Sequence, residues 1–125
     1  IATSGWRGRS HSLGIADSVS VLASNAAAAD VAATLIANAV DLPKHPTIKR
    51  TPAIELSPDS DLGNQLVTTG VGSLSSLDVE EALNRGIKYA NKIFNQGLIA
   101  GALLILCSEI RHVGFAKKIF IERRE

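Results

Sequence analysis

Apolar and polar positions alternate in the first part of the chain, and this alternation predicts strands. Residues 1–4 and 12–24 carry apolar side chains at every second or fourth position, which is the spacing of a strand with one buried face. A turn that contains Gly5 and Gly8 joins the two segments. We therefore expect a hairpin at the start of the chain.

Helical spacing begins after Asn25, which is a favourable N-cap for the Ala-rich segment that follows it. This segment predicts a helix that ends near Asp41. Residues 42–76 contain all four prolines of the chain, which exclude a long helix there. Within this region, residues 54–56 and 66–71 are expected to form short strands.

A second amphipathic helix is predicted from Asp78 to Gly97. Asp78 and Glu81 form a capping-box pattern at its start, and apolar side chains then recur every three or four positions. Glycine is common just after the end of a helix, which agrees with the position of Gly97.

The chain closes with two more aliphatic segments, residues 98–110 and 113–121, which predict a hairpin around an Arg111-His112 turn. The elements then follow as two strands, two helices and two strands, without a βαβ repeat. This order predicts an α+β two-layer domain over residues 1–125, an antiparallel sheet with two helices on one face. Because such a sheet has open edges, a second half, another subunit or a homo-oligomer is expected as partner.

Composition and charge are those of an ordinary globular domain. The 125 residues are 46% apolar, and a net charge of +1 gives no reason to expect nucleic acid or a membrane as partner. Cys107 is the only cysteine and lies in an apolar run, which predicts a buried thiol and a cytoplasmic protein. Because the chain begins at Ile1 and contains no methionine, we expect a fragment or a processed chain.

Asp30 and Thr34 are the candidate metal ligands. They lie four residues apart in the first predicted helix, so their side chains share one face. A carboxylate and a hydroxyl suit an oxygen-rich Mg²⁺ or Ca²⁺ site that also takes substrate phosphate and water. The alternative is that both residues, continued by Asn38, form the solvent side of an amphipathic helix.

The glycine turn before residue 12 is a candidate anion site. It contains Thr3, Ser4 and Gly5, followed by Arg7 and Arg9. Glycines let backbone N–H groups approach an anion closely, and arginines supply charge-assisted donors. The alternative is a basic hairpin loop with solvated arginines, since the spacing matches neither common phosphate-binding glycine motif.

Two further patterns have weaker chemical meaning. Ser4, His11 and Asp17 contain the groups of a hydrolase triad, although their spacing fixes no geometry. Asp59 and Asp61 resemble the start of a calcium loop but lack its terminal Glu, so an acidic surface turn is expected.

Four segments of the chain together resemble the C-terminal half of the ApbE family, Mg²⁺-dependent FAD:protein FMN transferases. The segments are residues 2–5 (ATSG), 10–11 (SH), 18–23 (SVSVLA) and 29–34 (ADVAAT). Two later segments are similar to an uncharacterised ApbE-like branch, namely residues 57–63 (SPDSDLG) and 97–102 (GLIAGA). The likeness covers nearly the whole chain and about the second half of a full-length family member.

The resemblance implies a T-fold, in which each unit has two strands, two helices and two strands. It also implies Mg²⁺ and FAD as cofactors, with Asp30 and Thr34 at the metal. Under the same resemblance, Thr3, Ser4 and Gly5 line the flavin nucleotide site. His11 matches the His that precedes an Asp-Pro-x-Thr-Gly loop in the transferases, a loop that this sequence lacks.

The sequence thus supports two hypotheses from different classes. The first is an ApbE-like domain that binds a flavin nucleotide with Mg²⁺, contacts phosphate through residues 3–9, and transfers FMN from FAD to a protein hydroxyl. The second is a noncatalytic assembly module whose sheet pairs with a missing N-terminal half. A serine hydrolase that uses Ser4 and His11 remains a third possibility.

Overall fold

The computed structural model describes residues 1–7 and 12–114 of the chain. Its elements are, in order, β1 (Ala2–Ser4), β2 (Ser18–Leu22), α1 (Ala26–Ala39), β3 (Ile48–Pro52), α2 (Ala53–Leu56), β4 (Leu66–Val71), α3 (Ser76–Asn95), β5 (Gly101–Leu106) and β6 (Glu109–Gly114).

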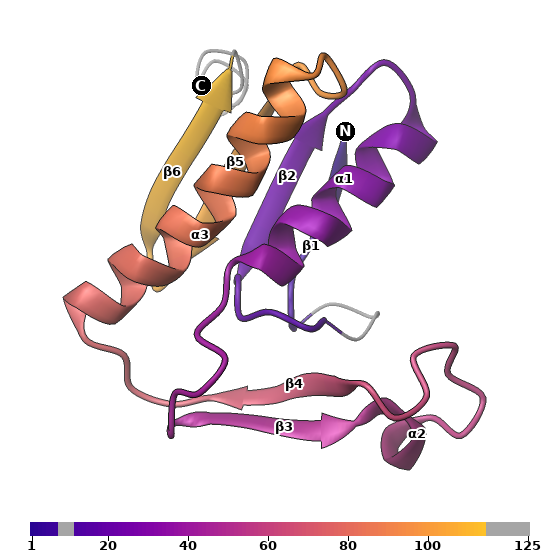
Figure 1. The fold of residues 1–125 in the computed structure, drawn as a ribbon, viewed down its shortest axis with the longest axis vertical. Helices are drawn as coiled ribbons and strands as arrows, with labels where there is room; N and C mark the ends of the chain where they lie inside the picture. The colour runs from indigo at the N-terminus through magenta and orange to yellow at the C-terminus, as the bar shows by residue number, and fades with distance from the viewer. Residues whose placement is uncertain (8–11, 115–125) are drawn as a thin grey trace.

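The main layer is a four-stranded antiparallel sheet in the order β1-β2-β5-β6. Helices α1 and α3 pack side by side on one face of it, α1 over β1 and β2 and α3 over β5 and β6 (Figure 1). This arrangement confirms the predicted α+β two-layer fold with an antiparallel sheet. The predicted order of two strands, two helices and two strands describes this layer.

The core lies between this sheet and its two helices. Val19 and Val21 of β2 point toward the helices and are fully buried, as the alternation in the sequence requires. Ile36 of α1, Leu83 of α3 and Leu104 of β5 meet them in one cluster and are also fully buried. Burying a side chain of this size stabilises the fold by roughly 1.5–3 kcal/mol.

The second strand is shorter than predicted, because residues 12–17 leave the sheet. The Ile15 N–H donates to the Val40 carbonyl at 2.8 Å, so this segment turns under the end of α1 instead of extending β2. The first helix itself agrees with the prediction, since the Asn25 side chain accepts the Ala28 N–H at 2.8 Å.

Between α1 and α3 the chain forms a separate two-stranded ribbon, β3 paired with β4, which lies across the end of the main layer (Figure 1). The prediction of β4 is confirmed, but β3 was not predicted. The strand expected at residues 54–56 is wrong: these residues belong to the short helix α2. Pro52 occupies the N-cap of α2, and an apolar triplet is too short for its spacing to distinguish a strand from one helical turn.

Helix α3 begins at Ser76, two residues before its predicted start at Asp78. Its N-cap is Ser75, whose side chain accepts the Asp78 N–H, while the Asp78 side chain accepts the Ser75 N–H. Asp78 thus occupies position N3 of the capping box and not its N-cap, and the proposed pairing with Glu81 is wrong. Gly97 follows the helix with a positive φ of 76°, as predicted for a helix end.

The closing hairpin has its turn at Cys107 and Ser108 and not at Arg111-His112. Both turn residues have positive φ, 50° and 68°, as a tight two-residue connection between twisted strands requires. Because Cys107 sits at this turn, it is exposed, and the predicted buried thiol is wrong.

None of the helices in the described residues has the length and apolar character that crossing a bilayer requires.

Candidate functional site

The first candidate residues, Thr3 and Ser4, lie on the edge strand β1 and point to opposite faces of the sheet. Thr3 pairs with Ser20, and the two hydroxyl oxygens are 3.0 Å apart on the face that the helices leave uncovered. Ser4 pairs with Val19, a core residue, and so points toward the layer of α1. The resemblance placed both residues at one nucleotide, but the two side chains are separated by the sheet.

Gly5 is buried where the chain leaves β1, and only glycine fits there. A Cβ at this position would lie 2.3 Å from the backbone oxygen of Asp17. Next to this contact, the Trp6 N–H donates to the Ala16 carbonyl at 3.1 Å. The start of the candidate anion loop is therefore fixed against the segment that enters β2.

Arg7 lies beside Trp6, with its guanidinium 5.0 Å from the centre of the indole ring, a cation–π contact. The indole Nε1 is a buried donor with no acceptor among the described residues. The remaining candidates of the loop, Arg9 and His11, lie outside the described residues.

The loop returns through Ser12 and Leu13, which the Asn38 side chain holds. Asn38 Oδ1 accepts the Leu13 N–H at 3.0 Å and the Ser12 hydroxyl at 3.3 Å. Ser12 is 4% exposed, and its oxygen also accepts the Gly14 N–H at 3.2 Å. The expectation that Asn38 continues a solvent-facing polar row is therefore wrong, because its amide binds the loop at the end of α1.

The β3–β4 ribbon supplies a second set of contacts to the same loop. Arg50 Nη1 donates to the Leu13 carbonyl at 2.8 Å, and its Nη2 pairs with the Asp41 carboxylate. Thr68, 5% exposed, donates its hydroxyl to the Gly14 carbonyl at 2.6 Å and its N–H to the Ser12 carbonyl at 2.8 Å. The loop is thus held from two sides by partly or fully buried polar groups.

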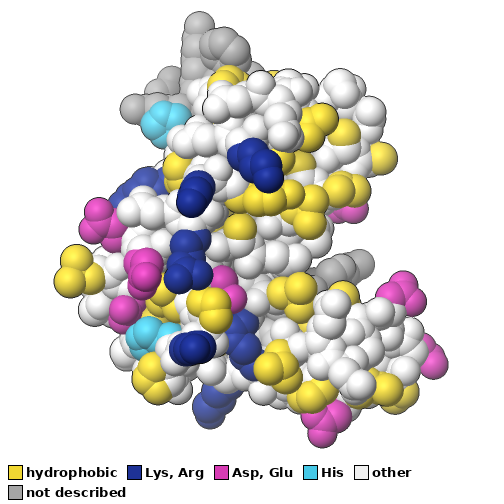
Figure 2. All heavy atoms as spheres, viewed as in Figure 1, with side chains coloured by type: hydrophobic (Ala, Val, Ile, Leu, Met, Phe, Trp, Pro, Cys, Tyr) yellow, Lys and Arg dark blue, Asp and Glu magenta, His cyan; other side chains and the backbone are white. Residues whose placement is uncertain are grey.

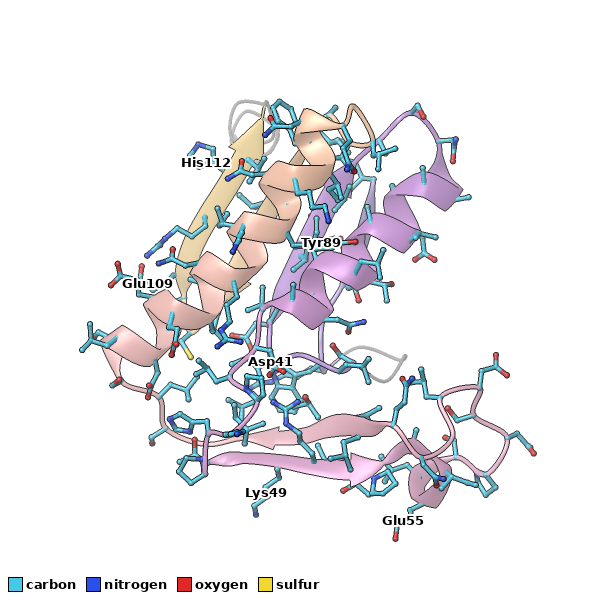
Figure 3. The ribbon with its side chains drawn as sticks, viewed as in Figure 1. Asp41, Lys49, Glu55, Tyr89, Glu109 and His112 are labelled. Carbon is cyan, nitrogen blue, oxygen red and sulfur yellow. The ribbon has the colours of Figure 1, made fainter. Side chains whose placement is uncertain are left out.

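Sequence reasoning did not find Arg50, Asp41 or Thr68. Each has polar or irregularly spaced neighbours in the sequence, and no local pattern distinguishes it from a surface residue. Figure 3 shows Asp41 between the end of α1 and the ribbon, where these contacts converge.

Asp30 and Thr34 lie together on the exposed side of α1, one turn apart, as their spacing predicts. The Thr34 hydroxyl donates to the Asp30 carbonyl at 3.1 Å, which leaves the hydroxyl lone pairs free. Helix α1 touches the described part of the loop at its C-terminal end, through Asn38 and Val40. Over the described ranges 1–7 and 12–114, no three His, Cys, Asp or Glu side chains group as a metal site.

Asp17, the third member of the considered hydrolase triad, serves the β5–β6 hairpin instead. Its carboxylate accepts the Cys107 N–H at 2.9 Å. Burial raises the pKa of the Cys107 thiol, and the nearby Asp17 carboxylate raises it further, whereas Arg7 lowers it. Within the described residues, Ser4 has no part in this arrangement, and His11 lies outside them.

A second polar cluster, also missed, joins the segment after α1 to the start of α3. His45 Nδ1 accepts the Thr47 N–H at 3.2 Å, so the neutral ring carries its proton on Nε2, which lies 2.9 Å from Asp78 Oδ2. The Thr47 hydroxyl also lies 2.9 Å from Nδ1. The Ser75 N–H and this His45 pair lower the pKa of the Asp78 carboxyl.

Two concavities lie near these elements. A cleft of about 320 Å³ beside the His45 cluster is lined by Leu42, Pro43, Lys44, His45, Glu81 and Arg85. A more apolar groove of about 390 Å³ runs between α1 and α3, where Figure 2 shows hydrophobic side chains at the surface. The Asp30 and Thr34 side chains line neither of them.

Comparison with known proteins gives one result. A family model described as AbpE bacteria matches residues 1–112, which include every candidate residue from Thr3 to Thr34. No match was found among curated proteins or among solved structures. The match covers most of the chain, so the protein belongs to the AbpE bacteria family, in agreement with the ApbE-like resemblance of its sequence.

Proposed function

We propose that this protein is an ApbE-like domain that binds a flavin nucleotide together with Mg²⁺. The observation that carries the proposal is the family match over residues 1–112, because it spans both the loop after β1 and helix α1, which carries Asp30 and Thr34. The structure supports it with a loop that is fixed at both ends, through Gly5 and through Ser12.

The donor set of α1 fits a magnesium ion. Mg²⁺ prefers octahedral oxygen coordination and usually keeps several waters, so one or two protein ligands suffice when substrate phosphate supplies others. The Asp30 carboxylate and the Thr34 hydroxyl are both exposed and one turn apart. When bound, the metal would neutralise pyrophosphate charge and its leaving group.

The residues of the loop would act on the nucleotide. Arg7 would contact phosphate through its guanidinium. Arg9 and His11, which come later in the same loop, would also contact phosphate. Ser4, which points toward the layer of α1, would line the nucleotide near the start of the loop, and the buried Gly5 would position the loop. Thr3 lies on the opposite face of the sheet and would not contact the same nucleotide. In a transfer of FMN from FAD, a hydroxyl of another protein would form a bond to the FMN phosphorus and lose its proton, the pyrophosphate linkage of FAD would break, and AMP would leave.

A noncatalytic assembly module is the second candidate, and a specific observation favours it. Asp30 and Thr34 are exposed on a helix, and among the described residues no three His, Cys, Asp or Glu side chains group as a metal site, as on an ordinary polar helix face. Under this reading, the sheet would serve to pair with a second half of the protein or another subunit.

Calorimetric titration with FAD, with and without Mg²⁺, distinguishes the two candidates. The protein should be used in the longest form that its gene encodes, as wild type, Asp30→Ala and the matched exposed control Asp61→Ala. Mg²⁺-dependent binding that Asp30→Ala abolishes and Asp61→Ala preserves would support the nucleotide-binding domain. If the wild type binds no FAD with or without Mg²⁺, the result would favour the assembly module.

A further inference from the structure

Strand β6 forms one edge of the main sheet. Every second residue of β6 therefore points its backbone N–H and carbonyl away from β5, toward the outside of the sheet. The Asp17 N–H donates to the Ile105 carbonyl at 2.9 Å, so the backbone of Ile105 points away from β6. Ile110 is the partner of Ile105 in the β5–β6 ladder. Because hydrogen-bonded and non-hydrogen-bonded pairs alternate in an antiparallel ladder, the N–H and carbonyl of Ile110 point outward, as do those of His112.

The side chains along this edge include a negative charge, a positive charge and, between them in the sequence, an isoleucine. Glu109 and Arg111 lie on the helix-covered face, since they pair with the core residues Leu106 and Leu104. Their side chains are 61% and 37% exposed, and Ile110 on the opposite face is 47% exposed. Figure 3 shows Glu109 and His112 along β6 at the margin of the molecule.

The outward groups restrict how a second β6 strand could pair with this edge. Only residues with outward backbone groups can exchange two hydrogen bonds across the new ladder, so Ile110 must face Ile110, His112 or Gly114 of the second copy. With Ile110 opposite Gly114, Arg111 of each copy faces Val113 of the other and has no charged partner there. With Ile110 opposite Ile110, Glu109 of each copy faces Arg111 of the other. With Ile110 opposite His112, two Arg111 side chains face each other, which is unfavourable.

We propose that β6 pairs antiparallel with β6 of a second copy of this chain, with Ile110 opposite Ile110. The pairing joins two four-stranded sheets into one and places two Glu109–Arg111 ion pairs around a central isoleucine pair. It does not depend on the nucleotide or the metal of the proposed function.

The local contacts of Arg111 are compatible with this exchange. In the single chain, Arg111 Nη1 donates to the outward Ile110 carbonyl at 3.0 Å and lies 3.5 Å from Glu109 Oε2. In the pair, the Ile110 carbonyl would instead accept the Ile110 N–H of the second copy. The guanidinium would then be free to meet Glu109 of that copy, so no acceptor of the edge loses its donor.

Sedimentation velocity over a concentration series tests the proposal with two charge reversals. Glu109→Arg and Arg111→Glu each place like charges opposite one another, and each should weaken self-association by about tenfold or more. An equimolar mixture of the two variants restores both ion pairs in a heterodimer, so the mixture should associate at least as well as the wild type. Glu55→Arg, an exposed reversal on α2, should associate as the wild type does.

Circular dichroism of each variant checks that the chain still folds, and the mixture itself controls for local damage. A wild type that remains monomeric throughout the series would overturn the proposal. A dimer that neither reversal weakens, or a mixture of the variants that stays monomeric, would overturn it equally. FAD binding is scored separately, so the failure of one proposal leaves the other standing.

Discussion

The helix-covered sheet and the β3–β4 ribbon differ in the balance of apolar and polar contacts that hold them. The sheet and its helices share an apolar core in which Ile36, Leu83 and Leu104 are fully buried. The ribbon adds Ile48 to the margin of that core, but it holds the candidate loop through hydrogen bonds and an ion pair, chiefly from Arg50 and Thr68. Apolar burial is tolerant of small displacements, whereas a polar junction depends on each donor meeting its acceptor. The candidate loop lies where these two kinds of packing meet.

The largest effect is expected in the apolar region. Leu83→Ala removes a fully buried side chain from α3 and leaves a cavity among its core neighbours. The free energy of unfolding should fall by about 2–5 kcal/mol, measured by urea titration. Leu77→Ala, on the same helix but 76% exposed, is the matched control and should change stability little. Equal effects at the two positions would contradict the assigned core.

At the polar junction, Arg50→Ala should cost about 2–4 kcal/mol, because it leaves the Asp41 carboxylate, whose side chain is only 16% exposed, without its partner. A double-mutant cycle with Asp41→Ala, followed by urea titration, measures the coupling between the two side chains. The double variant should be less destabilised than the sum of the single variants. Strict additivity would show that the pair has no energetic coupling.

Thr68→Val sharpens the comparison by removing one hydroxyl while keeping the shape of the side chain. The Gly14 carbonyl then loses a buried donor, so stability should fall by about 1–3 kcal/mol in the same titration. Thr69→Val, at the exposed neighbouring position, should have almost no effect. Amide hydrogen exchange should rise in residues 12–15 for the first variant and not for the second.

The smallest effect concerns the cluster that joins the segment after α1 to α3. The pKa of Asp78 is lowered in the folded protein, so its carboxylate stabilises the fold above the unfolded-state pKa, about 4. This stabilisation is lost as the pH falls through the lower folded-state value. The stability difference between wild type and Asp78→Asn, measured by thermal unfolding, should therefore shrink on acidification. A difference that stays constant from neutral to acidic pH would rule out the ionised cap.

Local signals in the sequence gave correct predictions where a single element determines its own structure. The Asn25 cap and the helical spacing of α3 needed no tertiary information, and the alternation in β2 located its buried face. The errors arose where two residues could make the same contact and the sequence does not show which of them makes it. Asp78 with Glu81 imitates a capping box, yet Ser75 lies at the same spacing before Asp78 and makes both bonds.

Candidate site residues were only partly predictable for the same reason. The exposed i,i+4 placement of Asp30 and Thr34 follows from helix geometry alone. In contrast, the contacts of Asn38 with Ser12, and of Arg50 with Leu13, join residues 26 and 37 positions apart. No local pattern carries such information, because these contacts exist only once the ribbon lies against the loop.

The exposed turn of the β5–β6 hairpin has a practical consequence. Cys107 is the only thiol of the chain and is accessible at that turn, so a nitroxide label attached there would be unique in each molecule. Its raised pKa means that labelling proceeds best under mildly alkaline conditions. Pulsed electron paramagnetic resonance on such a sample would yield a single dipolar spacing for a two-fold symmetric dimer, without the engineering of a second cysteine.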